Sequence, residues 1–274
     1  MTLIVALRWG QGILVSADTR VSAGPYAFYE EQKLFPILFS SEGKQSDLAI
    51  VAGAGDAALV KQGSNLMKNE FREWYEKRYQ EAANPSVEEV EKMVKNIQAK
   101  LISNYYELRK FGVEASADLL LATVTREGEP LLYTFNREGL AEPRHENPGY
   151  ALLGTGEITG GLLLMRLLGY SPKLADVGDA GLLSMFIIDM VSEVDPNVSP
   201  FLLPESSAYI RYDSEHEKVT IGALTLEAYG EYKRRIPEAK NLLKKLWSII
   251  EQGREEEVSN ILDKLLSSEE SHRS

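Results

Sequence analysis

The first fifth of the chain alternates between apolar and polar positions, and the period then changes. Residues 2–9 and 13–17 repeat with a period of two, and Gly10-Gln11-Gly12 separates the two segments. A period of two indicates strands, and a short glycine-containing break between them indicates a β-hairpin. Residues 34–39 and 48–52 predict a second pair of strands, in which Pro36 favours an edge position or a bulge.

After residue 55 the apolar positions recur about every four residues, which indicates helices. Asp56 is expected to cap a helix that ends near residue 79, and Ser86 with Glu89 has the spacing of a capping box for a second helix ending near residue 110. The remaining pattern predicts strands at 118–125, 130–136 and 150–153, helices at 157–168 and 175–193, and a strand hairpin at 207–213 and 218–223.

The predicted order is ββββ-αα-βββ-αα-ββ. Helix pairs that alternate with groups of strands favour two stacked sheets with helices outside, a layered α/β sandwich. Beyond residue 223 the chain is charged and helical in pattern, with a break at Gly253, a second helix at 255–266 and a frayed end at 267–274. We therefore expect an α/β body over residues 2–223 and a helical extension over residues 224–274.

Composition narrows the chemistry. The 274 residues include no Cys, and the 30 basic and 41 acidic side chains give a net charge of −11, which argues against non-specific nucleic-acid binding. His145, His216 and His272 lie far apart among polar neighbours and are expected at the surface, which argues against a His-based metal site or a Ser-His-Asp triad. No dinucleotide fingerprint, P-loop or metal-binding motif is present, so no cofactor and no metal are expected.

Two further observations concern the compartment. No signal-peptide pattern precedes the first strand, and the longest apolar stretch, residues 182–191, is too short to span a membrane and contains Asp189. We expect a cytoplasmic protein that has no membrane partner.

The strongest candidate for chemistry is Thr2. If Met1 is removed, Thr2 carries a hydroxyl and a free α-amine on one residue, which is a nucleophile with its own base. An α-amine has a pKa of about 7.7–8.0 in model peptides, so a useful neutral fraction exists near pH 7. With Met1 attached, the nitrogen is an amide and cannot act as a base.

Three other residues have properties that would assist such a nucleophile. A lysine such as Lys33 favours the deprotonated hydroxyl, and Asp18 would hold that lysine charged and oriented. Gly53 lies at a change from strand to helix, where backbone N–H groups can stabilise an oxyanion. From spacing alone, Asp18 with Arg20 could equally form an ion pair in a turn, and Gly53 could belong to an ordinary turn.

Taken together, several segments resemble the catalytic β-subunits of the 20S proteasome, within the N-terminal nucleophile hydrolases. The resemblance covers residues 2–223 and rests on Thr2, Ala17-Asp18-Thr19-Arg20, Lys33-Leu34-Phe35, Ala52-Gly53-Ala54-Gly55-Asp56-Ala57, Gly154-Thr155-Gly156, and Asp195 with Ser199. It implies the four-layer αββα sandwich of that family.

The resemblance also implies roles for individual residues. Thr2 would be the nucleophile, Asp18 and Lys33 the charge pair beside it, and Gly53 the oxyanion-hole N–H. Three residues would form hydrogen bonds around the Thr2 amine, and these are Thr155, Asp195 and Ser199. Arg20 would support the neighbouring loop.

The chain departs from the family pattern at several positions. Lys33 lies one residue closer to the nucleophile than usual, Thr155 replaces a serine, and Asp195 and Ser199 are one residue further apart. The glycine turn is one residue short, so Ala52 instead of Gly53 is an alternative for the oxyanion position. The extension after about residue 225 has no counterpart in ordinary β-subunits.

These features favour a threonine peptidase or amidase that forms an acyl-enzyme on Thr2 and acts on a peptide or protein substrate. Two alternatives remain: a peptide ligase or transpeptidase on the same scaffold, and an inactive structural subunit. The resemblance further implies a homo-oligomer or a proteasome-like ring.

Overall fold

The computed structural model of the chain describes residues 2–23, 27–41, 44–78, 83–114, 116–172, 176–201, 203–254 and 256–260. The chain divides into two compact units, Met1–Tyr229 and Gly230–Ser274. The predicted division between an α/β body at residues 2–223 and a helical extension at residues 224–274 remains a proposal.

One five-stranded sheet contains both predicted hairpins at the ends of the body sequence. Its strand order is β10-β1-β2-β11-β12, and all neighbouring strands are antiparallel. The strands are β1 (Ile4–Trp9), β2 (Gly12–Ala17), β10 (Tyr150–Leu153), β11 (Ser207–Asp213) and β12 (Lys218–Gly222). A Cβ atom on Gly12 would lie 2.3 Å from the Ile210 carbonyl oxygen, so the close approach of β2 and β11 requires glycine there.

The second five-stranded sheet has the order β5-β6-β7-β8-β9 and is also antiparallel. Its strands are β5 (Leu34–Ser41), β6 (Lys44–Gly55), β7 (Ala117–Val124), β8 (Pro130–Phe135) and β9 (Ala141–Pro143). Pro36 lies in β5, which is an edge strand, and the β5–β6 register shifts between Ile37 and Leu38. Both features predicted from Pro36 are thus confirmed.

The first two helices of the body begin at the predicted caps. The Asp56 carboxylate accepts hydrogen bonds from the N–H groups of Ala58 and Leu59, and Ser86 and Glu89 form the predicted capping box. The helical elements are α1 (Ala57–Arg78), α2 (Val87–Lys110), the π-turn η1 (Glu157–Gly161), α3 (Leu162–Leu168), α4 (Val177–Ser192), the 3₁₀ turn η2 (Pro204–Ser206) and α5 (Leu226–Glu251).

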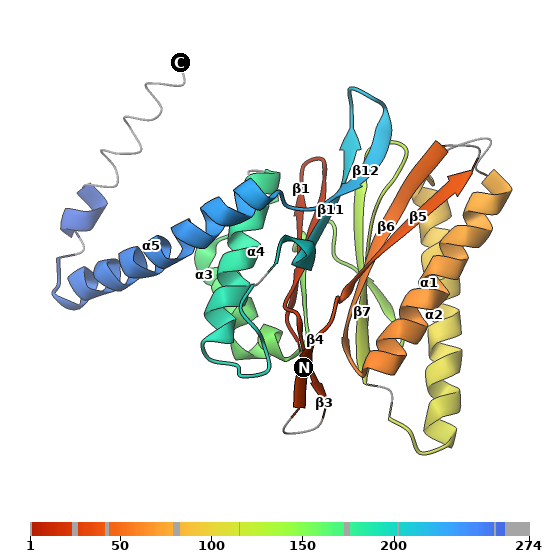
Figure 1. The fold of residues 1–274 in the computed structure, drawn as a ribbon, viewed down its shortest axis with the longest axis horizontal. Coiled ribbons are helices and arrows are strands. Elements are labelled where there is room, and N and C mark those ends of the chain that lie inside the picture. Colours follow the sequence, from red (N-terminus) through yellow and green to blue (C-terminus); the bar gives the residue numbers. More distant parts are fainter. Residues whose placement is uncertain are drawn as a thin grey trace. The chain divides into compact units, whose positions relative to one another are not determined.

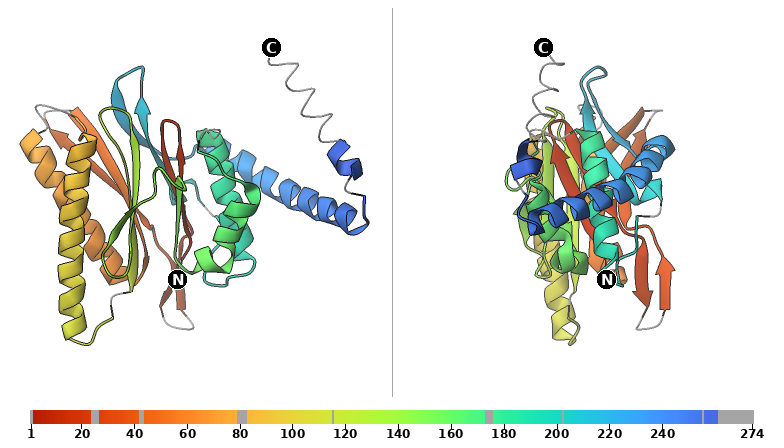
Figure 2. Two further views of the ribbon diagram at one scale, coloured as in Figure 1. Left: turned by 180° about the vertical axis from the view of Figure 1, so that it is seen from behind. Right: turned by 90° about the vertical axis from the view of Figure 1, so that its left-hand side faces the viewer.

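The body has four layers (Figures 1 and 2), with α1 and α2 on one side, two sheets in the middle, and α3 and α4 on the other side. The alternation within β6 explains the layering. Ala49 and Val51 belong to the cluster that packs against α1 and α2, whereas Ile50 and Ala52 belong to the cluster between the two sheets. Both faces of this strand are therefore buried, and the predicted αββα sandwich is confirmed.

The pattern missed three strands and the form of one helix. β3 (Arg20–Ala23) and β4 (Ala27–Glu30) pair only with each other, outside both five-stranded sheets, and β9 has only three residues. The predicted helix at 157–168 starts as a π-turn because Gly160 has a non-helical conformation with φ of 172° and ψ of −25°.

His145 was expected at the surface, and this expectation is wrong. Only 9% of the residue is exposed, its Nδ1 atom lies 3.1 Å from the Leu132 carbonyl oxygen, and its ring packs edge-on against Tyr133. His145 lies in the segment that follows β9, and the neighbouring Arg144 N–H bonds to the Leu132 carbonyl oxygen of β8 at 2.8 Å, so this segment packs against β8. His216 is exposed as expected, and His272 lies outside the described residues.

In the C-terminal unit, α5 continues to Glu251 and includes Pro237. Gly253 has a positive φ of 68°, which fits its predicted role as a break, and residues 256–260 are helical. The rest of the predicted helix, at 261–266, and the predicted frayed end, at 267–274, lie outside the described residues.

Replacing the cap of α2 tests how far local signals stabilise the helical layer. Ser86→Ala removes the hydroxyl that accepts the Glu89 N–H, so we expect the free energy of unfolding to fall by about 1 kcal/mol. Chemical denaturation would measure the change. Ser103→Ala, on an exposed position within the same helix, is the matched control and should change stability by less than about 0.5 kcal/mol. Equal effects of the two substitutions would contradict the capping role.

Candidate active site

Thr2 lies directly before β1 and is held by its backbone. Its carbonyl oxygen accepts a hydrogen bond from the Gly156 N–H at 3.2 Å. Gly154 has a φ of 93°, and a Cβ atom there would lie 2.1 Å from the same Thr2 oxygen. The turn of residues 154–156 therefore packs against the Thr2 backbone, and a side chain at Gly154 would displace it.

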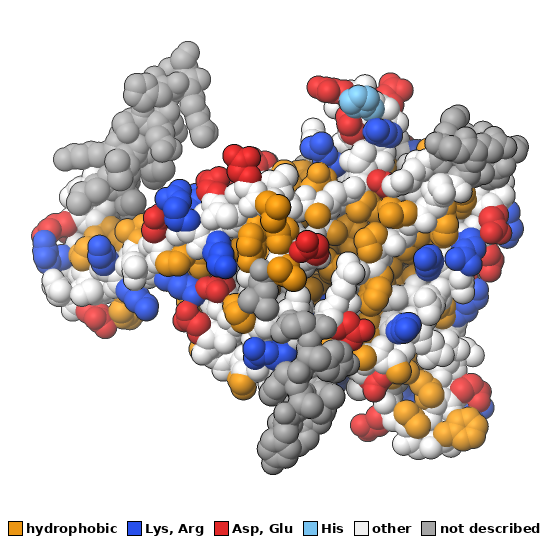
Figure 3. Space-filling model, in the orientation of Figure 1, with side chains coloured by type: hydrophobic (Ala, Val, Ile, Leu, Met, Phe, Trp, Pro, Cys, Tyr) orange, Lys and Arg blue, Asp and Glu red, His pale blue; other side chains and the backbone are white. Residues whose placement is uncertain are grey.

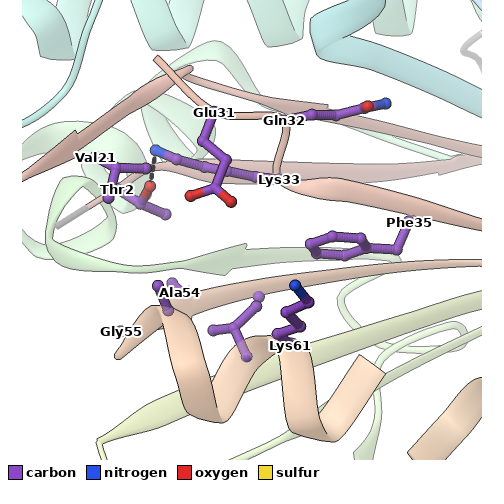
Figure 4. Close-up of a pocket in the computed structure, with 12 residues that line it drawn as sticks. Thr2, Val21, Glu31, Gln32, Lys33, Phe35, Ala54, Gly55 and Lys61 are labelled. Atoms are coloured by element: carbon purple, nitrogen blue, oxygen red, sulfur yellow. Dashed lines mark hydrogen bonds between the residues drawn. The ribbon is translucent and has the colours of Figure 1, made fainter. Parts of the chain in front are cut away.

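The Thr2 side chain contacts a buried ion pair. Its Oγ1 atom donates a hydrogen bond to Asp18 Oδ1 at 3.0 Å, and Lys33 Nζ donates to the same Thr2 Oγ1 atom (Figure 4). Lys33 Nζ lies 2.7 Å from Asp18 Oδ1, and the exposed fractions of the two side chains are 8% and 0%. The hydroxyl thus lies between a cation and an anion that are both shielded from water.

The order of the strands explains why these three residues meet. Thr2 precedes β1, Asp18 follows the last residue of β2, and Lys33 precedes β5 in the other sheet. β1 and β2 are hydrogen-bonded neighbours with Ile4 opposite Ala17, so their ends are adjacent. Lys33 reaches this point from the second sheet and also donates a hydrogen bond to the Arg20 carbonyl oxygen at 2.6 Å.

Both oxygens of Asp18 are saturated with donors. Oδ1 also accepts the Leu3 N–H at 2.8 Å, and Oδ2 accepts the N–H groups of Arg20 and Ser199, each at 3.2 Å. A buried charge that is paired and fully hydrogen-bonded avoids most of the cost of leaving water. Asp18 consequently fixes the positions of Thr2 and Lys33.

Ser199 and Arg20 hold the loop around Asp18. The Ser199 hydroxyl oxygen accepts hydrogen bonds from the N–H groups of Thr19 and Arg20, at 3.1 and 3.2 Å. The Arg20 guanidinium donates to the Pro196 carbonyl oxygen at 2.6 Å. Ser199 is therefore joined to the Thr2 site through Asp18.

Asp195 and Thr155 lie one step further from the Thr2 side chain. The Asp195 carboxylate accepts hydrogen bonds from the Thr159 hydroxyl and from the backbone and side-chain N–H groups of Asn197. Burial alone would raise the pKa of Asp195, but these donors outweigh it, so the pKa is lowered. The Thr155 hydroxyl is buried and has no hydrogen-bond partner among the described residues. Among the described residues, no hydrogen bond joins Thr155, Asp195 or Ser199 to the Thr2 backbone nitrogen, so their predicted place around the Thr2 amine stays a prediction.

A cavity of about 180 Å³ opens beside Thr2. Its lining combines the two sheets, the segment before β5 and the start of α1, and it consists of Thr2, Val21, Glu31, Gln32, Lys33, Phe35, Gly53, Ala54, Gly55, Ala57, Val60 and Lys61. Of the two alternatives for the oxyanion position, Gly53 lines this cavity and Ala52 does not. A Cβ atom on Gly53 would lie 2.6 Å from Val60 Cγ1, so the packing of α1 on β6 requires glycine.

The sequence analysis missed the charged side chains of this cavity. Glu31 extends into it from the segment before β5, and Lys61 extends from α1 on the opposite side (Figure 4). Within the described residues, neither side chain takes part in a hydrogen bond or ion pair. Glu31 is two residues from Lys33, so its position along the chain was an available signal, whereas Lys61 could be placed only by the packing of α1.

One group of possible metal ligands exists among the described residues. Asp213, Glu215 and His216 place their ligand atoms within 4.8 Å of one another at the β11–β12 turn, where acidic side chains and a histidine form an exposed tip (Figure 3). These residues do not line the Thr2 cavity. The described helices include none that is long and apolar enough to cross a membrane.

Comparisons with known proteins agree with the fold described above. Two solved structures of Anbu from Hyphomicrobium sp. strain MC1 have the same fold. The structure of the Gly-1 mutant matches with a TM-score of 0.65 and 17% sequence identity, and the match covers 92% of this chain and 100% of the Anbu chain. The second structure matches with a TM-score of 0.63 and 15% sequence identity, and the match covers 90% of this chain and 97% of the Anbu chain. No curated protein matches the sequence.

The sequence model of the family described as "Proteasome subunit" matches residues 2–145, which is more than half of the chain and includes Thr2, Asp18, Lys33 and Gly53. The chain therefore belongs to the proteasome subunit family.

Proposed function

We propose that removal of Met1 converts this chain into a threonine peptidase that acts through an acyl-enzyme. The observation that carries the proposal is the position of the Thr2 hydroxyl, which contacts both Lys33 and Asp18 at the wall of a cavity. Membership of the proteasome subunit family supports a hydrolase of this general type.

In the first half of the reaction, Thr2 Oγ bonds to the carbonyl carbon of a peptide while its proton passes to the Thr2 α-amine. The carbonyl oxygen becomes an oxyanion beside Gly53, where a backbone N–H would stabilise it. The C–N bond then breaks, the α-ammonium returns the proton to the leaving amine, and an ester on Thr2 remains.

In the second half, water loses a proton to the α-amine and attacks the ester carbon. The C–O bond to Thr2 breaks, and Oγ recovers the proton. Asp18 keeps Lys33 protonated, so Lys33 acts as a fixed positive charge that stabilises the developing alkoxide on Thr2. The base in both halves is therefore the α-amine.

We also propose that the chain forms a homo-oligomer and works in the cytoplasm. Support for assembly comes from its family, whose members are subunits by description. Light scattering of purified protein would measure the mass in solution.

The nucleophile can be tested by two substitutions at one position. Thr2→Ala should abolish peptide hydrolysis, whereas Thr2→Ser keeps a hydroxyl and should retain activity. Loss of the hydrogen bond to Asp18 costs about 1 kcal/mol, so both variants should stay folded. Release of amines from peptide substrates measures turnover. Hydrolysis by folded Thr2→Ala protein would overturn the assignment.

Removal of Met1 is a separate requirement. Intact-mass measurement of active protein should find chains that begin at Thr2, because a retained Met1 leaves an amide where the base must be. A Pro inserted between Met1 and Thr2 would bury the amine in a peptide bond and should give a folded, inactive protein. Full activity in chains that all retain Met1 would refute the proposed base.

The charge pair can be tested by comparing stability and turnover. Lys33→Met leaves Asp18 as a buried unpaired charge, so we expect stability to fall by about 3 kcal/mol and kcat by about 100-fold. Asp18→Asn combined with Lys33→Met should recover much of the stability but not the activity. Lys61→Met, which changes an exposed lysine, should leave stability within about 0.5 kcal/mol of the parent. A fully active Lys33→Met protein would contradict the role of the ammonium.

A further inference from the structure

A second cavity shares a wall with the one that contains Thr2. Its volume is about 220 Å³, and both cavities are lined by Glu31, Gln32 and Lys33. The other residues around the second cavity come from the end of β2, the start of β5 and the loop before β11, and they are Ala17, Asp18, Thr19, Leu34, Leu203, Glu205 and Ser206. A peptide held at Thr2 would have to pass the segment at residues 31–33 to reach the second cavity.

The charges around the second cavity are unbalanced. Lys33 and Asp18 neutralise each other, which leaves the exposed carboxylates of Glu31 and Glu205. Within the described residues, neither of these carboxylates takes part in a hydrogen bond or ion pair. The lining of the second cavity thus carries two carboxylates that are in no direct ion pair among the described residues.

A buried hydroxyl adds an independent observation. Ser206 is 7% exposed, and its Oγ atom has no hydrogen-bond partner among the described residues. Its backbone is fixed in η2, where the Ser206 N–H bonds to the Leu203 carbonyl oxygen at 3.0 Å. Buried hydroxyls are normally hydrogen-bonded, so this one indicates a missing partner at the cavity.

The lining combines these polar groups with aliphatic side chains. Leu34 and Leu203 offer apolar surface, and Glu31, Glu205 and Ser206 offer acceptors. A long aliphatic stem with a cationic end group meets both requirements, because the stem covers apolar surface while the charged end reaches the carboxylates. Lysine is the amino acid that combines a flexible stem with a compact cation.

The Thr2 cavity is less suited to such a group. Glu31 lines it as well, but the ammonium of Lys61 lines the same space and opposes a second cation. The two cavities therefore differ in charge, because Lys61 lines the Thr2 cavity and Glu205 lines the second cavity.

We propose that the second cavity is a subsite for a lysine side chain of the peptide substrate, close to the bond that Thr2 attacks. This inference rests on the proposed peptidase function. Glu31 and Glu205 bind the ammonium, and the Ser206 hydroxyl accepts one of its N–H groups. Arginine is a weaker alternative occupant, because the compact ammonium suits the single hydroxyl.

Binding to an inactive protein tests the subsite without requiring turnover. The protein is the full chain with Thr2→Ala, and the probes are acetylated hexaalanine amides in which one lysine is moved through the six positions. Matched peptides carry norleucine in place of lysine. Calorimetry should find one position at which lysine binds about tenfold more tightly than norleucine, since an exposed carboxylate contributes up to about fivefold.

Substitution of Glu205 assigns the effect to this cavity. Glu205→Gln in the Thr2→Ala background should reduce the preference for lysine to about threefold, and added salt should weaken it further. Glu138→Gln, an exposed glutamate that lines neither cavity, should leave the preference unchanged. Ser206→Ala should also weaken lysine binding. An unchanged melting temperature of the Ser206→Ala protein would show that the weaker binding does not come from misfolding.

The outcomes distinguish the subsite from the peptidase. Equal binding of lysine and norleucine peptides at every position, or an unchanged preference in Glu205→Gln, would overturn the subsite. Hydrolysis by the Thr2→Ala protein with the lysine preference intact would overturn the peptidase mechanism and leave the subsite standing. If both hold, the lysine peptide should have a higher kcat/KM than its norleucine counterpart in the Thr2 enzyme.

Discussion

The arrangement around Thr2 depends on one buried carboxylate. Asp18 accepts hydrogen bonds from Thr2, Leu3, Lys33, Arg20 and Ser199, and its side chain is fully shielded from water. Such a charge would be costly if any of its main partners were absent. The start of β1, the end of β2, the start of β5 and the loop before β11 are consequently tied to one point.

The sandwich places this point at the ends of two sheets. Small side chains such as Ala6, Ala52, Ala122 and Ala208 belong to the buried cluster between the sheets. Because these side chains are short, the sheets can pack closely, and Lys33 of one sheet can reach Asp18 of the other. Close packing and the ion pair therefore support each other, since neither sheet alone contains both partners.

The sequence predicted those parts of the fold that repeat over several residues. β1 and β2 were predicted from their period of two, and α1 and α2 were predicted from their helical period and their capping residues. Asp18 and Lys33 were singled out because a family resemblance supplied their roles. β3 and β4, which pair only with each other, and the three-residue β9 were missed. The π-turn depends on the conformation of one residue, Gly160, and the burial of His145 depends on the path of the segment after β9. Periodicity carries none of this information.

The cavities extend the same argument to specificity. Asp18 and Lys33 contact the Thr2 hydroxyl and are constrained by burial, so few substitutions at these positions keep the network intact. Glu31, Lys61 and Glu205 are exposed, take part in no ion pair among the described residues and do not contribute to the sandwich core. Their charges can change at little cost in stability. Under the proposed function, the chemistry would therefore depend on the buried network, and the choice of substrate would depend on exposed side chains around it, of which Glu31 lines both cavities.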